Sequence, residues 1–566
     1  MRDATVTLGP DGYFRRGARP LMPVGVNYWP ASCGVEMWTA WPEAEIRHDL
    51  DVVKGLGLNS IRFFLRWPDF EPELGSYDEA MFGRLRQFMG WCAERGLLAH
   101  PALVIGFMSG GHFWPRGKDQ RNLYADPLMR ERSAAFCRRA AEVLAPFHES
   151  MLAVDLGNEL GCADAWGAPP AAVRAWCAAV TAAIREAYPR ALIVCGLDSG
   201  QVTMDYGWRL GEQPGTDFYS AHTYPVPAWN IVPFDGMTDP FCQAILPFNV
   251  RAMRTFGPVM VQEFSTILAC GGPEVESYIH AVLPACLEAG ANGFLWWCLR
   301  DVRAAVEPYL HSGFEGRLGL VDAHDRVKPQ LECVMRFFRS LRDWTPPAPR
   351  PPADLALYWP LHYYRRDNPA NPGNEPTAVC RRMLAAYYLL TQSGHRVDIV
   401  RGGQPFPPGL RTLIIAGALL TSPEIEAVRT WVEQGGQVLW SGPAWRQWTE
   451  ACDALLGAQP VSIKSPRAMT VECFGERWTL PHFPADGRTE VRLTTAHVLA
   501  AAADGAPAII VNTLGKGRAV AVLPIPEETI ASVAADRPAR DRWRRWYDGL
   551  VALASPSRTG SPEGGA

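Results

Sequence analysis

The stretch MLAVDLGNE at residues 151–159 decides the fold that we predict for this chain. It begins as a continuous apolar run and ends in an amide and a carboxylate, Asn158 and Glu159. A second stretch, VMVQEFS at residues 259–265, has the same form, with Glu263 near its end. Strands that are buried on both faces have such uninterrupted runs, because helices cover both sides of a parallel sheet. We therefore interpret both stretches as parallel strands that carry polar side chains at their carboxyl ends.

Six further runs of this kind occur in the first part of the chain, separated by helix-like segments. They are LMPVGVNYW (21–29), SIRFFLRW (60–67), LLAHPALVIGF (97–107), ALIVCGLDS (191–199), DFYSAHTYP (217–225) and GFLWWCLRD (293–301). Eight strand-helix units are typical of the TIM (β/α)8 barrel, whose active site lies at the carboxyl ends of the strands. The sequence therefore predicts an α/β fold with a catalytic (β/α)8 barrel over residues 1–345.

Smaller domains are expected after the barrel. A Pro-rich stretch, TPPAPRPPAD (345–354), is expected to be a semi-rigid linker. Shorter strand-helix units over 353–450 predict a flavodoxin- or amidotransferase-like α/β domain. Short alternating runs over 451–553 predict a small β domain, in which APAIIVNTLGKGRAVAVLP (506–524) forms a hairpin. The tail at 554–566 is expected to be disordered.

One helix of the middle domain has a clear expected start. Ser422 is predicted to be its N-cap, and Pro423 its first helical residue. Ile425, Val428 and Val432 then recur with helical spacing and should face the core.

The composition argues against several classes of function. Hydrophobic residues make up 48% and charged residues 20%, which is the balance of an ordinary globular protein. The formal net charge is -4, from 55 Lys and Arg against 59 Asp and Glu, so we expect no nucleic-acid partner. No stretch reaches the ~18 uninterrupted apolar residues of a membrane span, so we expect no membrane partner. The 12 histidines show no HExxH or other ligand spacing, and we expect neither a metal nor another cofactor.

The 14 cysteines are scattered through apolar runs without a CxxC pair. Buried free thiols in a reducing compartment explain this distribution better than a disulfide framework. The first 30 residues contain no apolar run of signal-peptide length. Both observations predict a cytoplasmic protein.

The predicted barrel brings Glu159 and Glu263, on strands four and seven, to the same mouth. Glycoside hydrolysis needs such a pair, one acid to protonate the leaving oxygen and one carboxylate to attack the anomeric carbon. Further polar and aromatic residues stand at strand ends and are expected to bind the substrate: Asn27 and Trp29 on strand one, Arg62 on strand two, Asn158 on strand four, His222 and Tyr224 on strand six, and Trp296 and Trp297 on strand eight. For Trp297, stacking under a sugar and ordinary packing are both open, and Trp296 is the alternative residue facing the site.

The combination of VDLGNE, VQEFS, Arg62 and the strand-eight tryptophans resembles the clan A glycoside hydrolases. The resemblance implies that Glu159 is the acid/base and Glu263 the nucleophile of a retaining mechanism. It also implies that Asn158 binds the sugar 2-hydroxyl and that Tyr224, in the strand-six His-x-Tyr pattern, steadies the nucleophile.

Two further resemblances narrow the expected activity. GVNYWP and NSIRFFLRW are similar to family 5 β-mannosidases and mannanases, whereas the three-domain order resembles the family 42 β-galactosidases, without their metal-binding cysteine cluster. They imply an exo-β-mannosidase that releases single sugars from β-linked oligosaccharides or glycosides by double displacement. A β-galactosidase, a β-glucosidase and a catalytically inactive sugar-binding scaffold remain alternatives. The 353–450 domain shows no cysteine at a strand-to-helix elbow, and we expect it to mediate a homo-oligomer.

Overall fold

The computed structural model describes residues 5–267, 272–348, 351–364, 375–465, 468–482, 487–533 and 535–554. The chain folds as two compact units. The first contains residues 1–229 and 236–348, and the second contains residues 230–235 and 349–566. The tail beyond residue 554 and part of the predicted linker lie outside the described residues.

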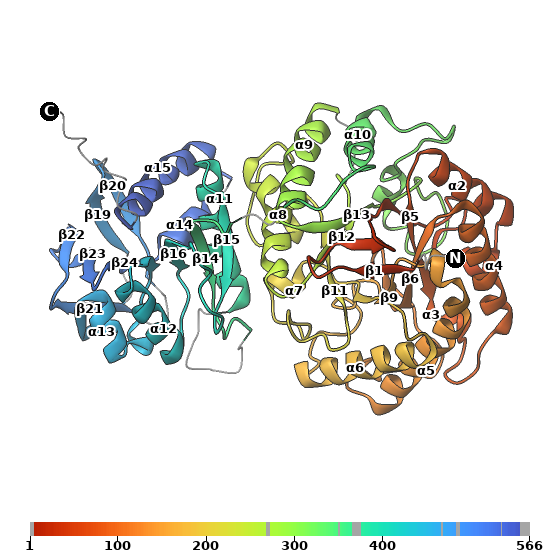
Figure 1. The fold of residues 1–566 in the computed structure, drawn as a ribbon, viewed down its shortest axis with the longest axis horizontal. Helices are drawn as coiled ribbons and strands as arrows, with labels where there is room; N and C mark the ends of the chain where they lie inside the picture. Colours follow the sequence, from red (N-terminus) through yellow and green to blue (C-terminus); the bar gives the residue numbers. More distant parts are fainter. Residues whose placement is uncertain are drawn as a thin grey trace. The chain divides into compact units, whose positions relative to one another are not determined.

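The first unit is a closed barrel of eight parallel strands, which confirms the predicted (β/α)8 fold (Figure 1). The barrel strands are β4 (Val24–Tyr28), β5 (Ser60–Arg66), β6 (Leu98–Ile105), β9 (Val154–Gly157), β10 (Ile193–Cys195), β11 (Phe218–Thr223), β12 (Val259–Phe264) and β13 (Ala291–Trp296). Strand β13 pairs with β4 and so closes the ring. Nearly every residue of these strands is buried, because side chains fill the barrel inside and helices cover it outside.

Helices follow the barrel strands and surround them (Figure 1). The longer helices are α2 (Glu43–Gly55), α4 (Glu79–Arg95), α5 (Pro127–Leu144), α6 (Pro170–Ala187), α8 (Pro240–Arg254), α9 (Gly272–Glu288) and α10 (Glu332–Ser340), and the short ones are α1 (Met37–Ala40), α3 (Trp67–Phe70) and α7 (Gly200–Thr203). Capping side chains and prolines mark where several of these helices begin. For example, Asp126 caps α5 by accepting from the backbone amides of Leu128 and Met129, and Pro127 occupies the first turn.

A small N-terminal sheet closes the amino-terminal end of the barrel. It consists of β1 (Val6–Leu8), β2 (Phe14–Arg16) and β3 (Arg19–Pro20). Phe14 is fully buried and meets Phe218 of β11 edge to face, with ring centroids 5.2 Å apart. This sheet therefore completes the barrel core, a role that the sequence analysis did not predict.

The second unit is built on one seven-stranded sheet. Its strand order is β15-β14-β16-β17-β24-β23-β22, with parallel pairing from β15 to β24 and antiparallel pairing beyond. The strands of this sheet are β14 (Leu355–Trp359), β15 (Val397–Arg401), β16 (Thr412–Ala416), β17 (Gln437–Ser441), β22 (His497–Ala501), β23 (Pro507–Leu514) and β24 (Gly517–Val522). The predicted hairpin is present as β23 and β24. Because β24 pairs with β17, the boundary predicted at residue 450 falls within a continuous sheet.

Helices and two small antiparallel pairs complete the second unit. Helix α11 packs on α14 and α15, whereas α12 packs on α13, and the two groups lie on opposite sides of the sheet (Figure 1). Their bounds are α11 (Pro376–Gln392), α12 (Ser422–Glu433), α13 (Glu450–Leu456), α14 (Pro526–Ser532) and α15 (Arg537–Ala554), and the paired strands are β18 (Ala458–Lys464) with β21 (Arg488–Leu493) and β19 (Met469–Cys473) with β20 (Glu476–Leu480). A barrel followed by an α/β sheet and further β strands matches the predicted fold class.

The predicted N-cap of α12 is wrong by one residue. Thr421, not Ser422, caps the helix, and it forms a capping box with Glu424. The Glu424 side chain accepts from the Thr421 backbone amide at 2.8 Å, and the Thr421 hydroxyl accepts from the Glu424 amide at 3.4 Å. The reciprocal bond requires Glu at the third helical position, and Glu424 takes that position only if Thr421 is the cap.

All cysteines in the described ranges are free thiols, and most of them are buried. Within the same ranges, no helix has the length and apolar character that crossing a membrane requires.

Candidate active site

Glu159 stands just beyond strand β9, at the carboxyl-terminal end of the barrel. Its backbone is in the left-handed region, with φ of 42°. A non-glycine residue seldom adopts this conformation, and such strain is often found at functional sites. Burial, and then the negative charge of Glu263, raise the pKa of Glu159, although the hydrogen bond with His222 opposes the shift. The carboxyl group is therefore suited to hold a proton.

Glu263 lies on β12 and receives a hydrogen bond at each carboxylate oxygen. Arg62 Nη1 lies 2.9 Å from its Oε2, and the Tyr224 hydroxyl lies 2.5 Å from its Oε1. Burial and the charge of Glu263 raise the pKa of Tyr224, so its hydroxyl keeps the proton that it donates. The two donors fix the orientation of the carboxylate.

Arg62, fully buried on β5, connects the strands beneath the two glutamates. Its guanidinium donates to Asp155 at 2.8 Å, to Asn27 at 3.0 Å and to Asn158 at 3.0 Å, besides its bond to Glu263. A buried arginine is stable only when its donors and charge are compensated, and this one has carboxylates on two sides. Arg62 thus sets the relative positions of four strands.

A glycine makes room for this network. Gly196 follows β10, and a Cβ there would lie 2.2 Å from the carbonyl oxygen of Gly157 and 2.8 Å from Arg62 Nη2. Any side chain at residue 196 would displace the guanidinium.

His222 of β11 faces both glutamates. Its Nδ1 lies 3.4 Å from Glu159 Oε1 and 3.8 Å from Glu263 Oε2. Burial alone would lower the pKa of this imidazole, but the charge of Glu263 and the hydrogen bond with Glu159 raise it overall. His222 is therefore electrostatically coupled to both carboxyl groups.

A bulge in β12 adds a residue that the sequence analysis missed. Ala221 pairs with Val261 and His222 pairs with Glu263, which leaves Gln262 as an extra residue between them. Successive strand residues ordinarily point to opposite faces, but a bulge re-aims a side chain. Gln262 accordingly reaches inward, with its Oε1 2.8 Å from His222 Nε2.

Glu315, on the 3-10 helix Gly313–Arg317, is a third carboxyl group near the site. It accepts from the Trp297 indole at 2.9 Å and from the Ser109 hydroxyl at 2.6 Å. Burial raises its pKa to about 7, and the charges of Glu263 and Glu159 act in the same direction. Nothing in the sequence around Glu315 pointed to this role, since it lies in a long loop after strand eight.

The predicted aromatic residues have different surroundings. Trp297 is held by Glu315 and meets Phe64 at 5.7 Å. Trp29 also stacks on Phe64, with ring centroids 5.3 Å apart. Trp296 instead packs against Phe264 and donates to the carbonyl of Leu318. Of the two strand-eight tryptophans, Trp297 is the one joined to the site network.

Asn27, the remaining predicted residue, is fully buried on β4. It accepts from Arg62 and donates to the backbone carbonyl of Gln262 at 3.1 Å. Its contacts make it a support for Arg62 and for the bulge.

One carboxyl oxygen of Glu159, one of Glu263 and a ring nitrogen of His222 all lie within 4.8 Å of one another. Retaining glycosidases place their carboxyl groups about 5–5.5 Å apart, and inverting enzymes about 6.5–9.5 Å apart. The short separation fits direct attack by one carboxylate. The same three residues offer ligand atoms for a cation, but the Arg62 guanidinium already compensates the charge of Glu263 at 2.9 Å.

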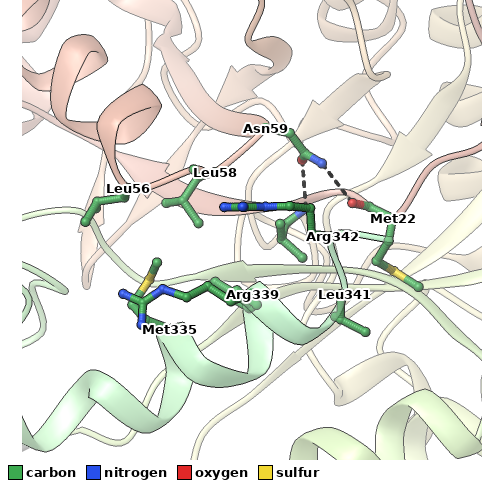
Figure 2. Close-up of a pocket in the computed structure, with 11 residues that line it drawn as sticks. Met22, Leu56, Leu58, Asn59, Met335, Arg339, Leu341 and Arg342 are labelled. Carbon is green, nitrogen blue, oxygen red and sulfur yellow. Dashed lines mark hydrogen bonds between the residues drawn. The ribbon is translucent and has the colours of Figure 1, made fainter. Parts of the chain in front are cut away.

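A separate cavity of about 160 Å³ lies at the opposite end of the barrel (Figure 2). Its wall includes Met22, Asn59, Arg339 and Arg342. Asn59 donates to the carbonyl of Met22 and accepts from the amide of Val24, so its amide group is already satisfied. Barrel enzymes react at the carboxyl ends of the strands, and we assign this cavity to packing.

No protein-family model matches the chain, and no curated protein does so either. Solved structures do match. The exo-β-1,4-mannosidase from Opitutaceae bacterium strain TAV5 is 43% identical over 97% of this chain and 100% of that chain, with a TM-score of 0.92. A glycoside hydrolase family 5, subfamily 18 protein from Streptomyces cattleya is 24% identical over 67% of this chain and 93% of that chain, with a TM-score of 0.58. A family 42 β-galactosidase from G. stearothermophilus is 15% identical over 94% of this chain and 88% of that chain, with a TM-score of 0.62.

The closed parallel barrel, the glutamate pair at its mouth and the 43% identity to a solved exo-β-1,4-mannosidase define a retaining glycoside hydrolase of clan A. The two more distant matches show the shared fold alone. The first match is much closer, and the chain belongs to the same glycoside hydrolase family as the exo-β-1,4-mannosidase from Opitutaceae bacterium strain TAV5.

Proposed function

We propose that the protein is an exo-β-mannosidase that releases single mannose units from β-linked oligosaccharides with retention of configuration. The observation that carries the proposal is the environment of the glutamate pair. Glu263 is oriented by two donors, and Glu159 lies beside it with a raised pKa. The sugar specificity rests on the 43% identity to an exo-β-1,4-mannosidase across almost the whole chain.

In the first step, a Glu263 carboxylate oxygen attacks the anomeric carbon while Glu159 gives its proton to the glycosidic oxygen. The bond to the leaving alcohol breaks, and a mannosyl ester forms on Glu263. Tyr224 and Arg62 hold the attacking carboxylate in line. Asn158, positioned by Arg62, is the proposed partner of the sugar 2-hydroxyl.

In the second step, water attacks the anomeric carbon of the mannosyl ester and displaces the Glu263 carboxylate. Esterification removes the negative charge of Glu263, which is one cause of the raised pKa of Glu159, so that pKa falls. Glu159 is then a carboxylate that accepts a proton from the attacking water. The ester bond breaks, and mannose leaves with its original anomeric configuration.

The stacking surface is proposed to be Trp297, with Trp29 behind Phe64 as part of the same aromatic wall. A flat indole face suits the apolar face of a pyranose ring, and the bond from Trp297 to Glu315 fixes its tilt.

We also propose that the protein works in the cytoplasm on short soluble oligosaccharides. The free, mostly buried thiols support this location, because disulfides are rare in reducing compartments. Neither a nucleic acid nor a membrane is part of the proposed activity.

The test is a panel of nitrophenyl β-D-glycosides together with β-1,4-linked manno-oligosaccharides. We expect turnover of the β-mannoside, with single mannose as the first product from each oligosaccharide. Preference for the galactoside or glucoside would replace the sugar assignment. Internal cleavage of a long mannan would contradict the exo mode, and no turnover by a folded protein would favour a sugar-binding scaffold.

A further inference from the structure

A chain of hydrogen bonds runs under the active site and begins at the backbone carbonyl of Ala153. A carbonyl oxygen can only accept, so His100 Nδ1, 2.9 Å away, carries the proton of that bond. Burial lowers the pKa of His100 to about 4, and the ring is therefore neutral near neutral pH. The other ring nitrogen, Nε2, is consequently an acceptor, and it lies 2.7 Å from Nε2 of Gln262.

The amide of Gln262 can take only one orientation in these surroundings. Its nitrogen faces His100 Nε2 and also Asp155 Oδ2, at 2.9 Å. Asp155 also receives donors from Arg62 and from the Gly196 amide, so it acts as an acceptor in each of these contacts. The amide oxygen is thereby directed at His222 Nε2, and that nitrogen must donate.

We propose that His100 and Gln262 are positioning residues that lock His222 in the Nε2–H tautomer and leave Nδ1 as the nitrogen that shares a proton with Glu159. Within the described part of the chain, the hydrogen bonds of the His100 and Gln262 side chains contact neither glutamate directly. Gln262 contacts His222 and Asp155, and the route to Glu159 that we assign to both residues runs through the imidazole. The charged groups that face His222 are Glu263, Glu159 and Arg62.

The tautomer matters because it decides where one proton resides. With Nε2 protonated, neutral His222 presents a lone pair at Nδ1, and the Glu159 carboxylic acid can donate to it. In the opposite tautomer, Nδ1–H would donate to Glu159 and stabilise its carboxylate. Of the two neutral tautomers, only the first keeps Glu159 in the acid form that proton donation requires. This consequence rests on the proposed function, whereas the tautomer itself does not.

The first measurement reads the tautomer directly. Full-length protein with ¹⁵N-labelled histidine is titrated by NMR, and the His222 signals are assigned by their loss in His222→Asn. In the neutral ring we expect a protonated Nε2 and an unprotonated Nδ1. A protonated Nδ1 in the neutral ring overturns the proposal. This result does not depend on the substrate, so it stands even if the protein turns over no β-mannoside.

The second measurement uses matched variants at His100. His100→Gln keeps an acceptor near the position of Nε2, whereas His100→Leu removes it at similar volume. Each is assayed on aryl β-mannosides with good and poor leaving groups. For His100→Leu we expect about a tenfold loss of kcat/KM with a poor leaving group. General acid catalysis accelerates such reactions by ~100-fold or more, and this variant weakens proton donation without removing the acid. Dinitrophenyl mannoside needs no protonation, so its rate should stay within about twofold of wild type.

The glutamine variant separates positioning from packing. His100→Gln should retain most of the activity on the poor leaving group, and the alkaline limb of its pH profile should stay near that of the wild type. In His100→Leu the pKa of Glu159 should fall, so that limb moves to lower pH. Equal losses on both aglycones, or equal losses in the two variants, overturn the proposal in favour of a purely structural role.

Discussion

Glu159 and Glu263 lie in the same barrel mouth, but their surroundings prepare them for opposite protonation states. Glu263 accepts two hydrogen bonds, whereas Glu159 is buried next to a negative charge that raises its pKa. Replacing each by alanine should therefore have different effects. Glu263→Ala should abolish the first step for every leaving group, by ~10⁴-fold or more, because no attacking group remains.

Glu159→Ala should behave differently, because it removes only the proton donor and the later base. With a dinitrophenyl β-mannoside the first step should survive, and a mannosyl ester should accumulate. Intact-protein mass spectrometry followed by peptide mapping should find the adduct on Glu263. An adduct on Glu159 in the Glu263→Ala protein would mean that the two roles are reversed.

Glu315 gives a prediction about stability and pH. Burial raises its pKa from 4.5 to about 7, so between those values the folded protein keeps a proton that the unfolded chain releases. The contribution of Glu315 to the free energy of unfolding should therefore fall as pH rises through this window and then level off. Glu315→Gln does not titrate, so relative to wild type it should gain about 3 kcal/mol between about pH 4 and pH 8.

Urea unfolding at the two pH values, monitored by tryptophan fluorescence, tests this expectation. Glu307→Gln is the control, because the Glu307 side chain is 60% exposed in the same loop region. It should show no comparable pH-dependent gain. A stability difference for Glu315→Gln that stays constant with pH would show that the pKa of Glu315 is the same in the folded and unfolded states.

Some residues of the site could be predicted from the sequence, and others could not. Glu159 and Glu263 stand at or near the carboxyl ends of apolar runs, and the barrel brings these ends together, so their convergence could be predicted. Arg62 was also expected at a strand end, but it is the third residue of β5 and reaches Glu263 through its long side chain. Gln262 could not, because its inward direction depends on a bulge. Glu315 reaches Trp297 through a loop, and a loop has no periodicity from which to predict contacts.

At the scale of elements, the start of α12 offers a direct comparison of neighbouring hydroxyl residues. Thr421→Ala removes the N-cap and half of the capping box, which should cost about 1 kcal/mol locally. Ser422→Ala removes a hydroxyl from the first helical position and should have little effect. Hydrogen-exchange mass spectrometry of peptides covering the first turn should show about fivefold faster exchange in Thr421→Ala alone. Equal acceleration in both variants would contradict the capping assignment.

Element types were easier to predict than element neighbours. The runs that became β14, β16 and β17 are mostly apolar, as strands inside a parallel sheet should be, and the β23–β24 hairpin followed from its turn residues. The pairing of β24 with β17 is a contact between distant parts of the chain, and neither strand encodes it locally. The packing of Phe14 on Phe218 could not be predicted for the same reason, because the two residues are far apart in the sequence.

At the scale of the whole molecule, we predict that the 353–450 region mediates a homo-oligomer. Leu361 is 53% exposed in this region, although it is a large apolar residue. Light scattering on the full chain at micromolar concentration should give a mass above that of one chain. Leu361→Glu should weaken the assembly, whereas Leu310→Glu, on the barrel unit and 60% exposed, should leave it unchanged. A monomeric wild type would rule the prediction out.

The N-terminal sheet has a consequence for synthesis of the protein on the ribosome. Phe14 leaves the exit tunnel early, but its partner Phe218 belongs to the sixth barrel strand, and β13 must follow before the ring closes on β4. At ~5–20 residues per second, roughly 15–60 s separate the emergence of the first strands from the completion of the surface that they cover. During that interval Tyr13 and Phe14 are exposed aromatic side chains in an otherwise polar, basic stretch of nascent chain. We expect it to be a binding site for chaperones that act during translation, and its docking to be among the last steps of barrel folding.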